Sequence, residues 1–383
     1  MGVGREYLGV VLQLRRLVPA WVESYTGPPE LVAAVEAGDA PSSDGVRASA
    51  DALAERISSE ENDGERRGWL LAQLGGISTA LRWLAGERLD YRTLFERCHG
   101  ASVELVGDDQ FKQAHALLEC ALPGKGHVGP RYRAWRANQL IAVDRLQAGF
   151  DLLAGEMRRR CRHRFGLPEG EAVKWELVGG KTYAGNADYL GALQTLVRIN
   201  TDLPISTNRL LELVCHEAYP GHHTENVCKG ALGREELSVF VYPSPQALIA
   251  EGIAECAIEA LLGADAELIA AECLRPAGIA YDHLTGAAVR EAEALLLPVA
   301  SNVALMLDDG ATSAEGHEYA QTWLLDDSEH IDRAITHLEA RPWRPYESCY
   351  PVGRELCRSY TAADDGRFAT LLHRQLTPAD LAA

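Results

Sequence analysis

Three histidines and a glutamate that could bind a metal and move protons lie within one short segment, HEAYPGHH, residues 216–223. The segment begins like the zinc-protease helix H-E-x-x-H, in which two histidines four residues apart share one face and bind zinc. The glutamate of that helix acts as the general base. In this chain the fourth residue after His216 is Pro220, so the plain motif is not present.

The next histidines follow six and seven residues after His216. On an unbroken helix, His222 would point about 240° away, and His223 would lie about 10 Å along the axis. Proline disrupts a helix interior and glycine accepts conformations that other residues resist, so a two-residue distortion at Pro220–Gly221 would return His222 to the metal. We therefore expect His216 and His222 to be metal ligands, Glu217 the general base and His223 a supporting neighbour.

A third ligand is expected in the segment QALIAEGIAE, residues 246–255. A catalytic zinc takes three protein ligands and leaves one position for water. In zinc hydrolases of the Glu-zincin type, a second helix supplies a glutamate ligand, and an acidic residue one turn later supports a ligand histidine. This pattern predicts Glu251 as a ligand and Glu255 as the supporting residue. Glu251, Glu255 and Glu259 also have the spacing of a solvated acidic stripe, an alternative that the spacing leaves open.

Hydrophobic periodicity predicts helices around this segment. Apolar residues recur at three- and four-residue steps, the spacing of a buried helix face, in two groups: Leu70, Leu74, Ile77, Leu81 and Leu84, and Val143, Leu146, Phe150, Leu153 and Met157.

The middle of the chain has a different pattern. Turn residues surround a β-prone run at 194–200, and Ser206 or Thr207 can cap the helix that carries the HE pair. From Gln246 onward the chain is expected to be helical, with breaks near Pro298, Gly310 and 342–353.

These elements predict a mainly α fold with a small β element next to the active-site helix. We expect an N-terminal helical region over 1–165 and a metal-binding catalytic region over 166–383, together forming one continuous helical body. A chain of 383 residues is long enough for a large buried core.

Composition excludes several classes of protein. The formal net charge of −18 argues against nucleic acid or an anionic membrane as the main partner. No apolar run reaches the roughly 18 residues that span a bilayer, and the N-terminus lacks the pattern of a signal peptide. The nine cysteines are scattered without a CxxC pair, which is typical of buried free thiols. We expect a cytoplasmic protein.

The segment HEAYPGHHTE resembles the signature HE-x-x-PGH-H-x-Q of a large, mainly bacterial family catalogued as a domain of unknown function, family 885. In that family EGWA follows on a later helix, and Glu251, Gly252 and Ala254 match it. Weaker matches are NVALMLDDGAT at 302–312 and the Tyr-x-x-Gly pattern at Tyr350–Gly353. The resemblance covers roughly residues 190–355.

The resemblance implies the fold of helical Glu-zincin peptidases, such as the oligopeptidases and thermostable carboxypeptidases. It also implies one zinc ion per chain and hydrolysis of a peptide or amide. Three positions depart from the family pattern: Glu225 replaces Gln, Ile253 replaces Trp and Thr312 replaces His. We expect these departures to affect the substrate-facing part of the site rather than the metal.

In the expected mechanism, Glu217 takes a proton from the attacking water and later passes it to the leaving group. Tyr350 stabilises the oxyanion, with Tyr346 as the alternative donor, and ordinary core packing is an open alternative for either tyrosine. The strand at 194–200 is expected to offer a free edge to an extended peptide.

Three alternatives remain open at this point. The enzyme could be a zinc-dependent biosynthetic hydrolase that acts on a small metabolite amide or ester. The chain could instead be a helical binding protein with a vestigial metal site, or its histidines could pack at a turn without any metal. His and carboxylate ligands also suit Mn, Fe or Co, and the sequence leaves the substrate and the oligomeric state open.

Overall fold

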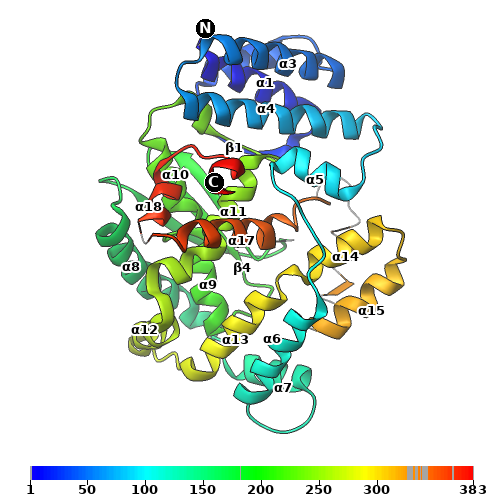
Figure 1. Cartoon of the computed structure of the whole chain (residues 1–383). Helices are drawn as coiled ribbons and strands as arrows, with labels where there is room; N and C mark the ends of the chain where they lie inside the picture. The colour runs from blue at the N-terminus through cyan, green and yellow to red at the C-terminus, as the bar shows by residue number, and fades with distance from the viewer. Residues whose placement is uncertain are drawn as a thin grey trace.

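The computed structural model describes residues 2–181, 183–325, 331–332, 335–336, 338, 344–364 and 366–382, and these residues are mainly helical. At one end, α1 (Val3–Leu17), α3 (Ser43–Glu60) and α4 (Gly64–Leu84) lie side by side (Figure 1). Ser42 caps α3 by accepting a hydrogen bond from the Gly45 amide, and Asp63 caps α4 in the same way. Such caps satisfy amides that have no partner inside the helix.

The first predicted helical face is confirmed in α4, where Leu70, Leu74, Ile77 and Leu81 are buried. They form a core with apolar residues of α1 and α3 and of two short strands. These strands, β1 (Val22–Tyr25) and β5 (Val239–Val241), pair antiparallel. The pairing attaches the N-terminal helices to the segment that leads into α11 (Pro245–Leu262).

A second sheet contains β2 (Ala172–Val178), β3 (Gly185–Gly191) and β4 (Gln194–Asn200) in the order β2-β4-β3. The strand expected at 194–200 is confirmed, but the expectation of a free edge is wrong. β4 pairs parallel with β2 on one side and antiparallel with β3 on the other, so β3 and β2 are the edge strands. A local pattern predicts a strand, whereas its neighbours depend on pairings between distant segments.

The largest core surrounds α8 (Val143–Phe165), α9 (Thr207–Glu217) and α11. The second predicted face is confirmed for Leu146, Phe150, Leu153 and Met157, which are buried in this core. Val143 is 68% exposed because it is the first residue of α8. Ser206 precedes α9 as expected, but its hydroxyl bonds Asn208 and does not cap the helix.

Helix α17 (Cys349–Thr361) lies along α11 (Figure 1), and the two backbones touch where two glycines meet. A Cβ atom at Gly252 would lie 2.3 Å from the Gly353 carbonyl oxygen, and one at Gly353 would lie 2.4 Å from the Leu248 carbonyl oxygen. No other residue type fits at either position without moving a helix. The close contact sets the distance between α11 and the residues around Tyr350.

The expected break at 342–353 is wrong in part. Residues 342 and 343 lie outside the described residues, 344–348 form turns, and 349–353 belong to α17. Pro351 is in the first turn of α17, where proline is tolerated because no backbone N–H is required there. The breaks near Pro298 and Gly310 are confirmed: α13 (His283–Leu296) ends before Pro298, and Gly310 follows the next helix with a φ of +103°.

The remaining helices complete the body around these elements. They are α2 (Pro29–Ala37), α5 (Tyr91–His99), α6 (Asp108–Ala121), α7 (Val128–Asn138), α10 (His222–Gly230), α12 (Ala266–Leu274), α14 (Pro298–Asp308), α15 (Ser313–Trp323), α18 (Arg367–His373) and α19 (Pro378–Ala382). Short 3-10 turns lie at Pro19–Trp21, Glu235–Ser238, Gly263–Asp265 and Arg275–Ala277.

The mainly α fold class is confirmed, while the expected division at residue 165 stays a prediction. Within the described ranges, no helix has both the length and the apolar character needed to cross a membrane. All nine cysteines are free, and all but Cys120 and Cys273 are buried, as expected for small apolar side chains.

Candidate metal centre

The HEAYPGHH segment forms a tight turn between two helices. Helix α9 ends at Glu217 and α10 begins at His222, so the distortion expected at Pro220–Gly221 is a complete helix break. The amide of Gly221 donates to the Cys215 carbonyl at 2.9 Å, and the amide of Thr224 donates to the Ala218 carbonyl at 3.1 Å. These bonds span six residues instead of the four of an α-helix, so the turn accommodates two extra residues before His222.

Glycine is required at position 221. A Cβ atom there would lie 1.9 Å from the His216 carbonyl oxygen and 2.5 Å from the Cys215 carbonyl oxygen. The chain therefore passes directly over the last turn of α9, an approach that only glycine permits. This close approach brings His222 back to His216.

The structure brings together the three residues expected to be metal ligands. The potential ligand atoms of His216, His222 and Glu251 all lie within 4.8 Å of one another. Nε2 of His216 is 3.4 Å from Glu251 Oε2, and Nε2 of His222 is 3.7 Å from Glu251 Oε1. The two imidazole rings are perpendicular, with an interplanar angle of 89° and centroids 4.8 Å apart. The side chains come from α9, α10 and α11.

One oxygen of Glu251 indicates that the cluster suits a cation. Oε2 is buried, and it lies 3.4 Å from Nε2 of His216, which is long for a hydrogen bond. A buried carboxylate oxygen without a close partner is costly. Two imidazole nitrogens and one carboxylate form the donor set of a catalytic zinc site, which leaves a position for water. The residues present therefore fit a divalent metal.

The charges within the cluster favour a protonated His216 when no metal is bound. Burial lowers the pKa of His216, but hydrogen bonds and charges from Glu251, Glu255 and Glu217 outweigh it and raise that pKa well above its usual value. Burial raises the pKa of Glu251, but the charge of His222 and the hydrogen bond from His216 outweigh it and lower that pKa. A metal ion would displace the proton from His216.

Two neighbours hold the expected ligands in place. Glu255 Oε1 lies 3.5 Å from Nδ1 of His216, the contact expected of a supporting carboxylate. The Tyr346 hydroxyl donates to Glu251 Oε1 at 2.6 Å. The ring of Tyr350 stacks against His216 with centroids 6.3 Å apart. The structure therefore places the two tyrosines differently: Tyr346 contacts a ligand carboxylate, and Tyr350 covers a ligand ring.

Glu217, the expected general base, is the last residue of α9 and is 6% exposed. It lies against the edge strand β3, because a Cβ atom at Gly185 would be 2.6 Å from Glu217 Oε1. Glycine at 185 therefore leaves the space that the carboxylate occupies.

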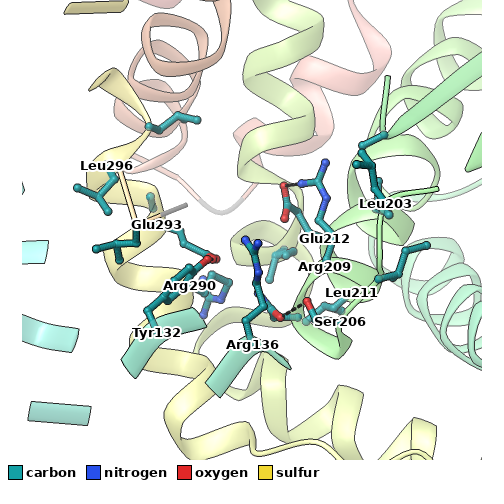
Figure 2. Close-up of a pocket in the computed structure, with 18 of the residues that line it drawn as sticks. Tyr132, Arg136, Leu203, Ser206, Arg209, Leu211, Glu212, Arg290, Glu293 and Leu296 are labelled. Atoms are coloured by element: carbon teal, nitrogen blue, oxygen red, sulfur yellow. Dashed lines mark hydrogen bonds and ion pairs between the residues drawn. The ribbon is translucent and has the colours of Figure 1, made fainter. Parts of the chain in front are cut away.

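A cavity of about 870 Å³ adjoins this cluster and is lined by Glu255 and Tyr350 among others. Figure 2 shows Arg209 and Glu212 of α9 in this cavity, across from Arg290 and Glu293 of α13. Pockets of this size hold small ligands, and the volume is sufficient for a short peptide. Guanidinium and carboxylate groups both line the wall, so the cavity is charged but not of one sign.

Two acidic residues near the HEAYPGHH segment were not predicted from the sequence. Glu23 lies on β1; the surrounding protein and the charges of Glu251, Asp188 and Glu217 raise its pKa to about 7, although part of its side chain faces solvent. No local pattern in the first strand signals this position.

Glu171, just before β2, is the second missed residue, and it contacts His223. Nε2 of His223 is 3.1 Å from Glu171 Oε2, and Nδ1 is 2.8 Å from the Thr195 hydroxyl. His223 is fully buried and is turned away from the three expected ligands.

The three departures from the family pattern have structural roles, and none of them lines the cavity. Glu225 pairs with Lys229 at 2.5 Å, and Ile253 is fully buried in the largest core. Thr312 caps α15 in a reciprocal arrangement with Glu315. The expectation that these positions face the substrate therefore finds no support in the cavity lining.

Comparison with known proteins shows a similar fold and gives no information on activity. No family model and no curated protein matches the chain. Among solved structures, the chain is similar to a "putative lipoprotein" from Colwellia psychrerythraea, with a TM-score of 0.55 and 16% sequence identity. The match covers 91% of this chain, which spans 64% of the length of that protein. At this identity the likeness shows a shared helical fold alone.

Proposed function

We propose that the protein is a zinc-dependent hydrolase that cleaves a peptide or amide bond, with His216, His222 and Glu251 as metal ligands. The observation that carries this proposal is that a buried Glu251 carboxylate and two histidines, from three helices, have potential ligand atoms that all lie within 4.8 Å of one another. Glu217 next to His216 supports a catalytic site, because a purely structural metal has no use for a general base.

A bound divalent metal would supply Lewis-acid activation of water and of the substrate carbonyl. The chain's own residues supply the rest. Glu217 accepts a proton from the attacking water and delivers it to the leaving nitrogen. Tyr350 donates a hydrogen bond to the carbonyl oxygen as negative charge develops there. Tyr346 and Glu255 orient Glu251 and His216 by the contacts described above.

An extended peptide would pair with β3 rather than β4. β3 is an edge strand of the described sheet and passes Glu217 at Gly185. Backbone pairing along an edge gives affinity without selecting one side chain. The Glu-zincin architecture, the relationship to family 885 and a cytoplasmic location belong to this proposal and remain predictions.

A hydrolase of a small metabolite amide or ester is the second candidate. The observation that favours it is the charged cavity of about 870 Å³ lined by Glu255 and Tyr350, because such a cavity suits a compact polar ligand. Parallel screens of short peptides and of small amides and esters separate the two candidates.

The first test is metal content. The protein is purified without added metal, and bound elements are measured by mass spectrometry for the wild type, His222→Ala and Glu217→Gln. We expect about one zinc per chain in the wild type and in Glu217→Gln, and none in His222→Ala.

Glu217→Gln should lose roughly 10²- to 10⁴-fold in turnover on any substrate that the screens identify.

His163→Ala is the matched control, because His163 is an exposed histidine on α8 and its loss should leave the metal in place. If the wild type holds no stoichiometric metal even after zinc is offered, the hydrolase proposal fails and a helical binding protein becomes the better description. Full turnover by Glu217→Gln would remove Glu217 from its role as base.

A further inference from the structure

The buried carboxylate of Glu171 collects four hydrogen-bond donors from two parts of the chain. Arg158 Nε at 2.7 Å and an Arg162 terminal nitrogen at 3.0 Å reach Oε1 from α8. The Tyr219 hydroxyl at 2.8 Å and Nε2 of His223 at 3.1 Å reach Oε2 from the α9–α10 turn. The Glu171 side chain is fully buried.

The two donors from the turn lie on either side of the His222 ligand. Tyr219 precedes Pro220, and His223 directly follows His222. A single carboxylate therefore attaches both ends of the turn to the start of β2. The second nitrogen of His223 bonds Thr195 on β4, so the imidazole is fixed from both sides and cannot rotate without losing a bond.

The charge of Glu171 is compensated where it lies. A buried carboxylate is costly unless it is paired and hydrogen-bonded, and two guanidinium groups and two neutral donors meet that need. Burial would raise the pKa of Glu171, but hydrogen bonds from His223, Arg158 and Tyr219 outweigh it and hold the pKa at about 2. The carboxylate therefore stays charged, and charge-assisted bonds are stronger than neutral ones.

We propose that Glu171 is a positioning residue for the metal centre: it holds the α9–α10 turn so that His222 is presented to the metal that His216 and Glu251 share. The metal in this inference is the one that the proposed function assumes. The hydrogen bonds by which Glu171 holds the turn do not depend on that metal. This positioning role differs from that of a purely structural ion pair, which would stabilise the packing of α8 on the sheet and leave the turn unchanged.

Three variants distinguish these roles. Glu171→Gln removes the charge and places an amide against four donors. Tyr219→Phe removes a single hydroxyl and keeps the ring, so it tests the turn even if Glu171→Gln fails to fold. Glu236→Gln is the matched control, because Glu236 is also a fully buried carboxylate that accepts two bonds from one arginine, Arg66, at 2.7 and 2.8 Å.

Three quantities are measured on each purified full-length protein. They are the melting temperature, the zinc affinity by competition with a chromophoric chelator, and the hydrogen exchange of peptides covering residues 214–226 in the metal-free state. The visible spectrum of the cobalt-substituted protein adds a direct report on ligand geometry. None of these readouts depends on knowing the substrate.

We expect Glu171→Gln to lower zinc affinity about 10- to 100-fold, the usual effect of losing an outer support of a ligand histidine, and to accelerate exchange in residues 214–226. Tyr219→Phe should change both in the same direction by less. Glu236→Gln should lower the melting temperature without changing either.

Unchanged affinity and exchange in Glu171→Gln and Tyr219→Phe would overturn the inference, and so would equal changes in Glu236→Gln. If the wild type binds no zinc but exchange in the turn accelerates as expected, the proposed function fails and the holding of the turn stands. If zinc binds and only the exchange prediction fails, the proposed function stands and the inference fails.

Discussion

Tyr346 and Tyr350 lie four residues apart, yet their contacts assign them different roles. The Tyr346 hydroxyl donates to Glu251 and is also hydrogen-bonded to Tyr350, whereas the Tyr350 ring packs on His216 and lines the cavity. The ring centroids of the two tyrosines are 5.5 Å apart. A substitution at one tyrosine can therefore affect the other, so the effects of the same substitution at both positions should be compared.

Removing each hydroxyl should separate catalysis from metal binding. Tyr350→Phe should lower kcat by roughly 10²-fold, the usual effect of losing one oxyanion donor, with zinc affinity unchanged. Tyr346→Phe should weaken zinc binding, because Glu251 loses the bond that orients it. Steady-state kinetics and chelator competition on both variants measure these effects, and each variant is the control for the other. A larger kcat loss in Tyr346→Phe with intact zinc binding would reverse the assignment.

The helix break between α9 and α10 is the element on which the site depends. Gly221→Ala should destabilise the protein by at least about 3 kcal/mol and abolish zinc binding, because the new Cβ would displace the backbone at His216. Gly155→Ala is the matched control: Gly155 is an exposed position within α8 with nothing near a new Cβ, and alanine there should stabilise the helix by about 0.5–1 kcal/mol.

Chemical denaturation of both glycine variants and of the wild type measures these changes. A stable Gly221→Ala variant that still binds zinc would show that the turn has room that the backbone contacts do not indicate.

Elements whose pattern is local could be predicted from the sequence. The buried faces of α4 and α8 follow from apolar spacing, and the Pro220–Gly221 pair predicted a distortion that returns His222 to His216. The central position of β4 could not be predicted, because it depends on pairing with β2 across more than 20 residues. The expected helix break around Pro351 was wrong, because this proline fits the first turn of α17.

The two acidic residues near the site, Glu171 and Glu23, could not be predicted either, because their contacts also depend on distant segments. Glu171 and Glu23 precede or lie within short strands far from HEAYPGHH in sequence, and nothing in their own surroundings marks them. Their positions become clear only when the fold brings Glu171 to the α9–α10 turn and Glu23 near the carboxylates of Glu217 and Glu251. The motif therefore predicted which residues form the His216, His222 and Glu251 cluster, but not the residues that hold its turn in place.

At the scale of the whole molecule, the N-terminal helices contact the rest of the chain through buried residues, one of which is His99. His99, at the end of α5, is fully buried between Phe95 and Tyr242, whose ring centroids lie 4.4 and 6.1 Å away. Nδ1 lies 3.1 Å from the Phe95 carbonyl oxygen, and Nε2 has no partner within the described part of the chain. Burial lowers the pKa of His99 to about 3.

This histidine should make the fold sensitive to acid. In the unfolded chain His99 binds a proton near pH 6.5, but in the folded protein it does so only near pH 3, so stability is lost as pH falls below about 6.5. His99→Phe removes this contribution. The unfolding free energy of the wild type, measured by denaturation from pH 7.5 to 4.5, should fall relative to the variant by up to about 1.4 kcal/mol per pH unit. Parallel curves for the two proteins would contradict the assignment.

The contact between Gly252 and Gly353 has a mechanical consequence. Because α11 and α17 touch through their backbones, no side chain at the crossing can change rotamer to let one slide past the other. Glu251, Glu255 and Tyr350 therefore move as one rigid body. We expect any widening of the cavity to come from α7 or α13, which also line it, so Glu251 and Tyr350 should keep their spacing when a ligand enters.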